Sequence, residues 1–541
     1  MTGTMTDAPT TREKVEYWGT RLGCILAVAG SAVGLGNFLR FPGQAVQYGG
    51  GAFMIPYFCA LLFLGIPIGW AEWTLGRYGG RKGFHSVVGI FGMTGHSSIT
   101  RYVGVLGLLI PFVIYMYYSV IEAWCLQYAW GYLTGGINLG ADPQQYAEAS
   151  GAVFNQITGA DRNGLLKGGW LDTPTIFWLI VFLLNFGLIY RGLTRGIENF
   201  CRWAMPAIAV CAIVVLIRVL TLGTPDPTQP ENSVINGLGF MWNPDFSALG
   251  DFKTWLAAAG QVFFSLSVGF GIIMNYSSYL RKKDDVVLSA LTASSTNATF
   301  EVAFGGLISI TAAFVFLGAA GTTGGTFGLG FNTLPIVFEY MGPIGRITGA
   351  VWFLMLFLAA ITSSLSMLNP LRAFVEEALS FTRKQSVTLL MVLTAAGALW
   401  VLYFSQGLTA LDTMDFWVGT ALIFIVATTQ IIIFAWIMGI DRGLAEAHQG
   451  AKMRIPKAYR FIIKYVAPVY LLIVFIGFCI QNLPGYISGL AHNHVARYTI
   501  YFIGFNLLVL IVITQIAVRR WKAAGIDIDG RLPDDEGVKP S

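Results

Sequence analysis

Twelve apolar segments, each long enough to cross a lipid bilayer as a helix, follow one another along the chain. About 20 consecutive apolar residues span the hydrocarbon core of a membrane. The segments occupy residues 18–42, 52–76, 102–132, 175–191, 199–221, 254–280, 286–318, 347–375, 386–405, 414–439, 461–483 and 496–518. Charged residues make up 12% of the chain, about half of the fraction in soluble proteins. We therefore predict an all-α polytopic membrane protein with twelve transmembrane helices embedded in a lipid bilayer.

Glycine and polar residues interrupt the first and the sixth of these segments. Residues 31–42 read SAVGLGNFLRFP, and residues 265–271 read SLSVGFG. Glycine also serves close packing in membrane helices, so one such pair would mean little. An unpaired backbone group in hydrocarbon costs several kcal/mol, however, so a break must be buried in protein or line a water-filled cavity. Two breaks at matching positions indicate a substrate and ion site near the middle of the bilayer.

The two breaks lie five predicted spans apart. Five is odd, so the second set of five spans enters the membrane from the opposite side, which predicts two inverted-topology repeats. The predicted organisation is a cytoplasmic N-terminal segment 1–17, a first repeat 18–221, a second repeat 254–439, two additional helices within 461–518, and a polar cytoplasmic tail 522–541. We expect the tail to be disordered.

Basic residues are concentrated in the loops on one side of the predicted membrane: Arg77, Arg81, Lys82, Arg101, Arg191, Arg195, Arg202, Arg281, Lys282, Lys283, Arg442, Lys452, Arg454 and Lys457. Positively charged loops stay in the cytoplasm, which predicts a multi-pass protein of the inner (plasma) membrane with both termini cytoplasmic. The net charge of +5 therefore reflects topology, and we expect no nucleic-acid partner. The first 17 residues contain no signal-peptide pattern, and the six cysteines form no CxxC pair.

Seven motifs occur in the order in which one transporter family carries them: WGTRLG at 18–23, AVGLGN at 32–37, RFP at 40–42, GGGAF at 49–53, GRYG at 76–79, TSS at 362–364 and MDFW at 414–417. Through them the chain resembles the neurotransmitter:sodium symporter family, and within it the bacterial LeuT-like amino-acid transporters. The resemblance runs from about residue 14 to 520. It implies a LeuT-type 5+5 inverted repeat with broken helices 1 and 6, and sodium-coupled import of a neutral, hydrophobic amino acid by alternating access.

The resemblance implies two sodium sites. The first takes Ala32, Asn37, Ser265 and Asn297, and the substrate carboxylate completes it. The second takes Gly30, Val33, Ala359, Thr362 and Ser363. Carbonyls, amides and hydroxyls supply the oxygen ligands that sodium requires without burying net negative charge. For the hydroxyls alone, bonding back to their own helix is a common alternative.

By the same resemblance the substrate lies between the breaks. The N–H groups of Leu35 and Gly36 open a half-helix whose positive end suits a carboxylate, and Tyr118 donates a hydrogen bond to the same group. The remaining implied substrate-binding residues are Ser31, Ala32, Ile114, Phe264, Ser265, Ser267, Phe270, Ile361, Ser363 and Met367. Gly34 stands where amine-transporting relatives carry an aspartate, which favours a substrate that brings its own carboxylate.

Gates and a buried acid complete the implied site. Arg40 and Asp415 resemble the outer gate, and an arginine within an apolar segment is a functional candidate on energetic grounds. Tyr279 and Glu377 resemble the inner gate, but the family's arginine before Trp18 is Val15 here, which leaves Lys14 or Arg12 as substitutes. Glu301 stands where chloride-dependent relatives have a serine. A fixed carboxylate supplies the same negative charge, which implies chloride-independent transport. If this buried acid loses and regains a proton over the cycle, the transporter also carries a proton in the opposite direction (proton counter-transport).

Other classes of protein find little support in the sequence. No GxxxxGK[ST] motif predicts an ATP-driven pump, and the five histidines lack HExxH spacing, so we predict that the chain is not an enzyme. The alternatives that stay open are a sodium-coupled symporter of an osmolyte of the betaine or taurine type and, more remotely, a membrane receptor or channel. A homodimer is also left open.

Overall fold

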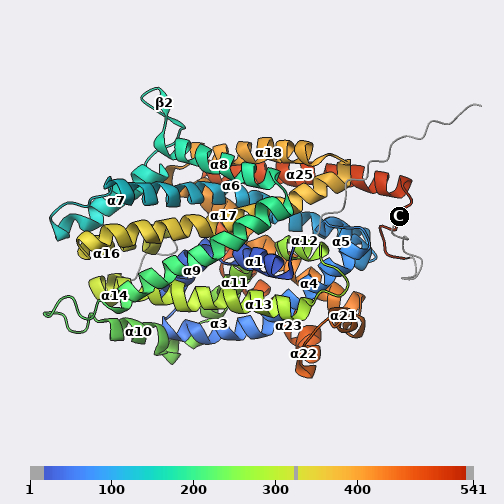
Figure 1. The fold of residues 1–541 in the computed structure, drawn as a ribbon, viewed down its shortest axis with the longest axis horizontal. Helices are drawn as coiled ribbons and strands as arrows, with labels where there is room; N and C mark the ends of the chain where they lie inside the picture. Colours follow the sequence, from blue (N-terminus) through green and yellow to red (C-terminus); the bar gives the residue numbers. More distant parts are fainter. Residues whose placement is uncertain (1–17, 322–326, 532–541) are drawn as a thin grey trace, which may run out of the picture.

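The computed structural model describes residues 18–321 and 327–531. In that part of the chain, ten helical stretches are long and apolar enough to cross a membrane, and the bent pair Leu22–Ala32 and Gly36–Gln47 forms an eleventh span. The remaining predicted span, the sixth, consists of two helices (residues 252–266 and 272–278), each too short to cross a bilayer alone. Figure 1 shows the helices running side by side along the long axis of the molecule.

The membrane-spanning elements follow the order of the predicted segments, with short 3₁₀ or π segments labelled η. They are α1 (Arg21–Ala32), η1 (Gly36–Arg40) and α2 (Phe41–Gln47) in span 1; η2 (Gly51–Phe53), α3 (Met54–Ala60), η3 (Leu61–Gly65) and α4 (Ile66–Arg81) in span 2; α6 (Ser98–Thr134) in span 3; α8 (Thr173–Tyr190) in span 4; η5 (Leu193–Glu198) and α9 (Asn199–Leu220) in span 5; α11 (Phe252–Leu266) and α12 (Ile272–Ser278) in span 6; α13 (Val286–Thr299), η7 (Phe300–Gly306) and α14 (Leu307–Gly321) in span 7; α17 (Pro343–Leu379) in span 8; α18 (Arg383–Tyr403) in span 9; η9 (Gln406–Leu408), α19 (Thr409–Phe416), η10 (Trp417–Leu422), α20 (Ile423–Ile432) and η11 (Ile433–Ile437) in span 10; α22 (Lys457–Phe461), η12 (Ile462–Val466), α23 (Ala467–Gln481) and α24 (Leu483–His492) in span 11; and α25 (His494–Ala523) in span 12.

Shorter elements lie at the two ends of the bundle. Figure 1 places α7, α10 and α16 at one end, and α5 and α21 at the other. These and the remaining elements are α5 (Val87–Thr94), η4 (Pro143–Gln145), α7 (Tyr146–Thr158), β1 (Leu166–Lys167), β2 (Trp170–Leu171), α10 (Val234–Trp242), η6 (Phe246–Gly250), η8 (Gly328–Thr333), α16 (Leu334–Tyr340) and α21 (Ile440–Ala447). Strands β1 and β2 form a two-stranded antiparallel hairpin that projects sideways from the bundle.

The predicted breaks are present in spans 1 and 6. In span 1, α1 ends at Ala32, and the chain resumes as η1 at Gly36 with a bend of 44°. In span 6, three residues between α11 and α12 have positive φ: Ser267 (54°), Gly269 (83°) and Gly271 (71°). Glycine adopts this region without steric cost, whereas a serine there is uncommon. Both spans are therefore unwound where the glycines occur.

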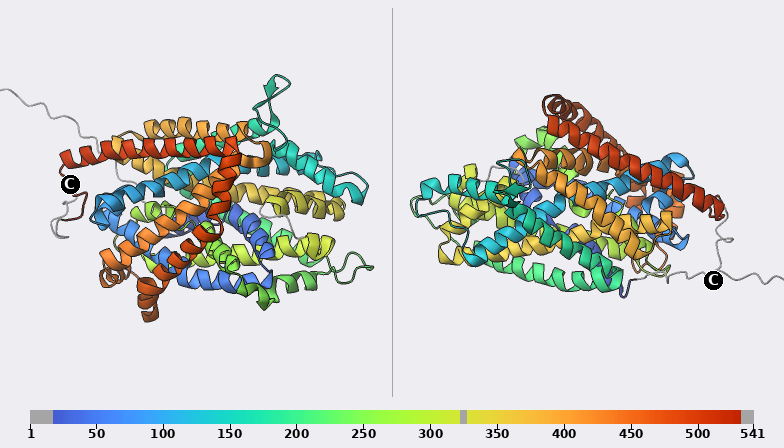
Figure 2. Two further views of the ribbon diagram at one scale, coloured as in Figure 1. Left: turned by 180° about the vertical axis from the view of Figure 1, so that it is seen from behind. Right: turned by 90° about the horizontal axis from the view of Figure 1, so that it is seen from above.

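Helices α6 and α17, each of 37 residues, pack along one another and form the centre of the bundle. Most of their residues are buried, including polar ones such as Tyr118, Thr362 and Ser363. Figure 2 shows α25 lying along the outside of the bundle. The unbroken central helices thus provide a continuous support against which the two broken spans pack.

The start of the C-terminal tail differs from the disordered segment that its polarity predicts. Arg101, which is 4% exposed, pairs with Asp529 at 2.5 Å and also donates to the Ile528 carbonyl. Ile528 itself is buried. One apolar side chain and one carboxylate facing a buried arginine are enough to fix this part of the tail against the bundle. Residues 532–541 of the predicted tail lie outside the described residues.

Replacing Gly305 by alanine should destabilise the protein, because the added carbon would overlap the backbone oxygen of Asn37 beside the break in span 1. Overpacking of this kind costs about 1–3 kcal/mol, so thermal unfolding in detergent should show a lower melting temperature. Gly187→Ala on α8 is the matched control, since nothing lies within 4 Å of its added carbon. Equal melting temperatures for both variants would contradict the close contact of span 7 with the break.

Candidate functional site

The two breaks contact each other directly. The Ser267 hydroxyl donates to the Ser31 carbonyl at 3.3 Å, and the Gln261 side-chain amide donates to the Gly36 carbonyl at 3.2 Å. A side chain of the other broken span thus meets the Ser31 carbonyl, and Gln261 adds a second bond to the Gly36 carbonyl, which also accepts the Phe41 N–H. Ser31, Gly36, Gln261 and Ser267 are all buried.

A first group of oxygen-bearing side chains lies beside the breaks. Asn37 Nδ2 donates to Asn297 Oδ1 at 2.8 Å, and Asn297 Nδ2 donates to the Ser265 hydroxyl at 2.6 Å. Asn37 Oδ1 accepts the Gly34 N–H at 2.9 Å. The structure therefore brings together three of the residues predicted for the first sodium site. The fourth, Ala32, ends α1 nearby in the chain and is 7% exposed.

A second group joins α17 to α1. The Ser363 hydroxyl lies 3.3 Å from the Gly30 carbonyl oxygen, 3.1 Å from that of Ser31 and 3.2 Å from that of Ala359. The Thr362 hydroxyl donates to the Ala359 carbonyl at 2.9 Å, so it bonds back to its own helix. Val33 lies at the end of α1 and is fully buried. The oxygen atoms gathered here are those that a sodium ion prefers.

Glu301 lies directly behind the first group and is fully buried. Its carboxylate accepts hydrogen bonds from Tyr57 (2.6 Å), Ser265 (2.8 Å) and Gln261 (2.5 Å). The sequence reasoning missed Tyr57 and Gln261. Gln261 lies one turn before Ser265 on α11, a spacing that could have indicated it, whereas nothing in the sequence links Tyr57 to this acid.

A cavity of about 200 Å³ lies beside the breaks. It is lined by Leu35, Gly36, Leu39, Arg40, Tyr117, Tyr118, Ile121, Phe264, Phe327, Asp412 and Asp415. Leu35, Gly36, Tyr118 and Phe264 are predicted substrate-binding residues, and the Leu35 N–H donates to the Tyr118 oxygen at 3.1 Å. The other predicted pocket residues, Ile114, Phe270, Ile361 and Met367, are buried in the surrounding core.

Gly34 leaves no room for a side chain. A Cβ atom at this position would lie 2.5 Å from the Ser363 hydroxyl and 2.8 Å from the Tyr118 hydroxyl, and real Cβ contacts do not come this close. A carboxylate attached at position 34 would therefore need the side chains of Ser363 and Tyr118 to move.

The predicted outer-gate residues, Arg40 and Asp415, face the same cavity. In the part of the chain that the structure describes, they form no ion pair with each other. The Arg40 guanidinium lies over the Phe264 ring, 4.5 Å from its centroid. Asp415 instead accepts a hydrogen bond from Tyr117 at 2.7 Å. Asp412, one turn before Asp415, also lines the cavity. Tyr117 and Asp412 were not among the predicted site residues.

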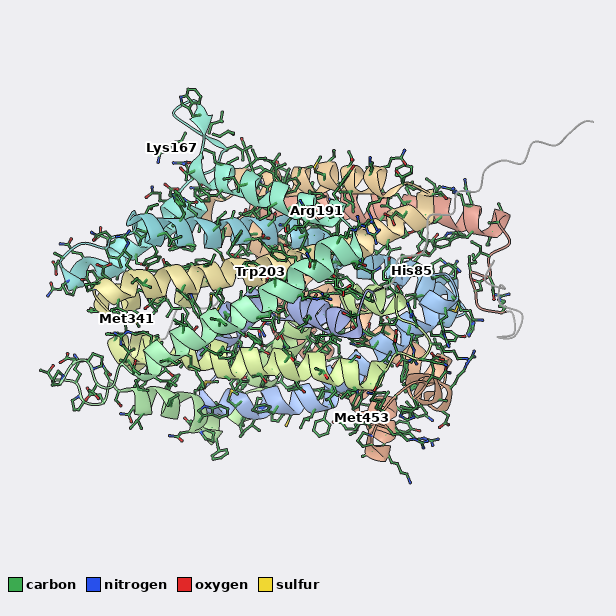
Figure 3. The ribbon with its side chains drawn as sticks, viewed as in Figure 1. His85, Lys167, Arg191, Trp203, Met341 and Met453 are labelled. Carbon is green, nitrogen blue, oxygen red and sulfur yellow. The ribbon has the colours of Figure 1, made fainter. Side chains whose placement is uncertain are left out.

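The predicted inner-gate residues lie at the other end of the bundle, near His85 (Figure 3). Glu377 accepts the backbone N–H groups of His85 (3.1 Å) and Ser86 (3.0 Å). The Tyr279 ring stacks on His85 with 4.5 Å between centroids. Arg12, Lys14 and Val15 lie outside the described residues.

Comparison with known proteins agrees with this geometry. A model of the sodium:neurotransmitter symporter family matches residues 15–152 and 154–523. The chain belongs to this family. An uncharacterized sodium-dependent transporter of Methanocaldococcus jannaschii is 31% identical to the symporter over 465 residues, which cover 84% of this chain and 89% of that protein.

Two further relatives bear on the fold and on the range of substrates in the family. The sodium-dependent serotonin transporter of Drosophila melanogaster is 28% identical over 498 residues, covering 85% of this chain and 76% of that protein. The crystal structure of MhsT in complex with L-phenylalanine is 29% identical, covers 86% of this chain and 99% of that chain, and superposes with a TM-score of 0.74. The symporter therefore has the LeuT-type fold with broken helices 1 and 6. It is a sodium-dependent secondary transporter of the membrane and not an enzyme.

Proposed function

We propose that this symporter couples sodium entry to the import of a neutral, hydrophobic amino acid by alternating access. The observation that carries the proposal is Gly34, which lies between Tyr118 and Ser363 at the break and brings no carboxylate of its own. A substrate that lies at the break must then supply its own carboxylate, as a zwitterionic amino acid does. The complex of MhsT with L-phenylalanine supports an amino acid with an apolar side chain.

The two groups of oxygen atoms fit two sodium ions. Asn37, Ser265 and Asn297, with the Ala32 carbonyl and the substrate carboxylate, would hold the first ion. Thr362 and Ser363, with the carbonyls of Gly30, Val33 and Ala359, would hold the second. Because side chains of α17 and the backbone of α1 contribute to the second group, an ion there would stabilise one arrangement of the broken helix against its support.

We further propose that Glu301 replaces chloride and carries a proton during the return of the empty carrier. Its oxygens accept from four neutral donors, the side chains of Tyr57, Gln261, Ser265 and Asn297, so no cation among those donors fixes its charge. Sodium beside it favours the ionised form, and once sodium and substrate have left, burial favours the protonated form. The orientation proposed with this cycle is an inner-membrane protein with both termini in the cytoplasm.

Uptake into proteoliposomes should require a sodium gradient. Each sodium ion entering at about 100 mV gains about 2.3 kcal/mol, and a tenfold gradient adds about 1.4 kcal/mol, so two ions support roughly 10⁵-fold accumulation of a zwitterion. A competition panel of the twenty amino acids with betaine and taurine identifies the substrate. Undiminished uptake in potassium would contradict sodium coupling, and competition by betaine or taurine alone would favour an osmolyte.

Replacing Thr362 and Ser363 together by alanine should lower the apparent sodium affinity at least tenfold, because two hydroxyl ligands are lost. Substrate affinity should fall with it, since ion and substrate bind the same state. Titrations of substrate binding against sodium measure both effects. The control is Thr388→Ala on α18, an exposed hydroxyl bonded to its own helix. A double variant with the sodium dependence of the wild type would show that the second site lies elsewhere.

Glu301→Ser should create a requirement for chloride, because it removes the fixed negative charge beside the first sodium site. Uptake by this variant should be low in gluconate and recover in chloride, whereas uptake by the wild type should be equal in both anions. Glu301→Gln, which keeps the size of the side chain, should show whether volume alone matters. The role is refuted by a wild type that needs chloride or by a serine variant that ignores it.

A further inference from the structure

Three side-chain pairs join α12, the second half of the broken span 6, and the residue that follows it, Tyr279, to α17. The Tyr276 hydroxyl donates to Ser366 at 3.0 Å. Asn369 donates to Asn275 at 2.6 Å, and Arg372 donates to the Tyr279 hydroxyl at 3.4 Å. The α17 partners are spaced three residues apart, so they lie along one face of the helix. These pairs form the contact that has to separate if a path opens at this end of the molecule.

Arg372 is the member of this row nearest the C-terminal end of α17, and it is 2% exposed. Besides Tyr279, its guanidinium contacts Asn369 at 3.0 Å and both carboxylate oxygens of Glu376 at 3.0 and 2.9 Å. One buried cation therefore bonds to α12, to the side chain that holds Asn275, and to an acid one turn along its own helix.

The loop after span 2 packs onto the same contact. The His85 ring stacks on Tyr279, its Nδ1 atom lies 2.8 Å from the Ser278 hydroxyl, and its backbone carbonyl accepts from Asn275 at 2.9 Å. Burial of the ring and the positive charge of Arg372 lower the pKa of His85 to about 4, so the ring is neutral at pH 7. A neutral ring can lie beside the guanidinium without repelling it.

We propose that Arg372 is the cation of the inner gate in this chain, where the position at which the family resemblance expects an arginine is Val15. This inference rests on the proposed alternating access. Closing the gate joins Arg372 to Tyr279 across the path, and opening it breaks that bond while Glu376 keeps the charge paired on α17. Breaking a buried ion pair outright would leave an uncompensated charge. Because Arg372 and Glu376 lie on one helix, their pair stays intact when the gate opens.

Hydrogen–deuterium exchange of the full-length protein in lipid nanodiscs, in sodium and without substrate, tests this role. Arg372→Gln should speed exchange of residues 272–286 and 82–86 at least tenfold, because it removes charged hydrogen bonds that hold the closed state. Arg372→Lys keeps the charge but lacks the planar set of N–H donors of a guanidinium, so it should show a smaller increase in the exchange rate. The matched control is Arg346→Gln at the opposite end of α17, where Arg346 donates to the carbonyls of Tyr132 and Leu133.

The outcomes separate the gate from the transport proposal. Faster exchange confined to the gate peptides in the Arg372 variants supports the inference, and equal exchange in the Arg372 and Arg346 variants overturns it. It is also overturned if an Arg12→Gln, Lys14→Gln double variant alone speeds exchange of these peptides. If Arg372→Gln does not fold, Arg372→Lys and Tyr279→Phe give the same comparison. Absence of sodium-driven uptake by the wild type would contradict the proposed function. The exchange experiment would still test whether Arg372 holds the gate contact closed.

Discussion

The structure depends on how the unpaired backbone of the two helix breaks is satisfied inside a membrane protein. A continuous helix bonds its own carbonyls, but the Ser31 carbonyl is met by Ser267 from the other broken span and by Ser363 from α17, and Gln261 adds a bond to the Gly36 carbonyl. In the hydrocarbon core of a membrane, an unpaired backbone carbonyl finds no water to donate a hydrogen bond to it. The two breaks and α17 therefore support one another, and the polar interior that they create is where ions and a charged substrate can be held.

The candidate site combines fixed and adjustable parts. Tyr118 and Ser363 project from α6 and α17, the two long helices at the centre of the bundle. The groups that they meet, the Leu35 N–H and the Gly30 and Ser31 carbonyls, belong to the broken span 1. A ligand bridging the two parts has different contacts whenever the broken helix shifts, and only such a difference lets a ligand change the balance between conformations.

Buried carboxylates in the interior are stabilised by neutral donors. Glu301 accepts from Tyr57, Ser265 and Gln261, Glu72 accepts the Gly269 N–H at 2.8 Å, and Glu122 accepts from Asn185. None of the three forms an ion pair with a lysine or arginine in the described part of the chain. Hydrogen bonds without a fixed counter-charge leave room for a mobile cation, which is the arrangement that a sodium-coupled carrier needs. Arg372, in contrast, carries its own acid on the same helix.

The sequence by itself determined the helical spans, the two breaks and most of the oxygen-bearing residues around them, because hydrophobic length and glycine placement act locally along the chain. It also carried the motifs that identify the family. Only the tertiary structure decided which distant groups meet: Tyr57 with Glu301, Ser363 with Ser31, and Arg372 with Tyr279. It also placed Arg40 over Phe264 and Asp415 beside Tyr117, and fixed the start of the polar tail against Arg101. These contacts join residues far apart in the chain, and they follow from how whole helices pack rather than from any local pattern of residues.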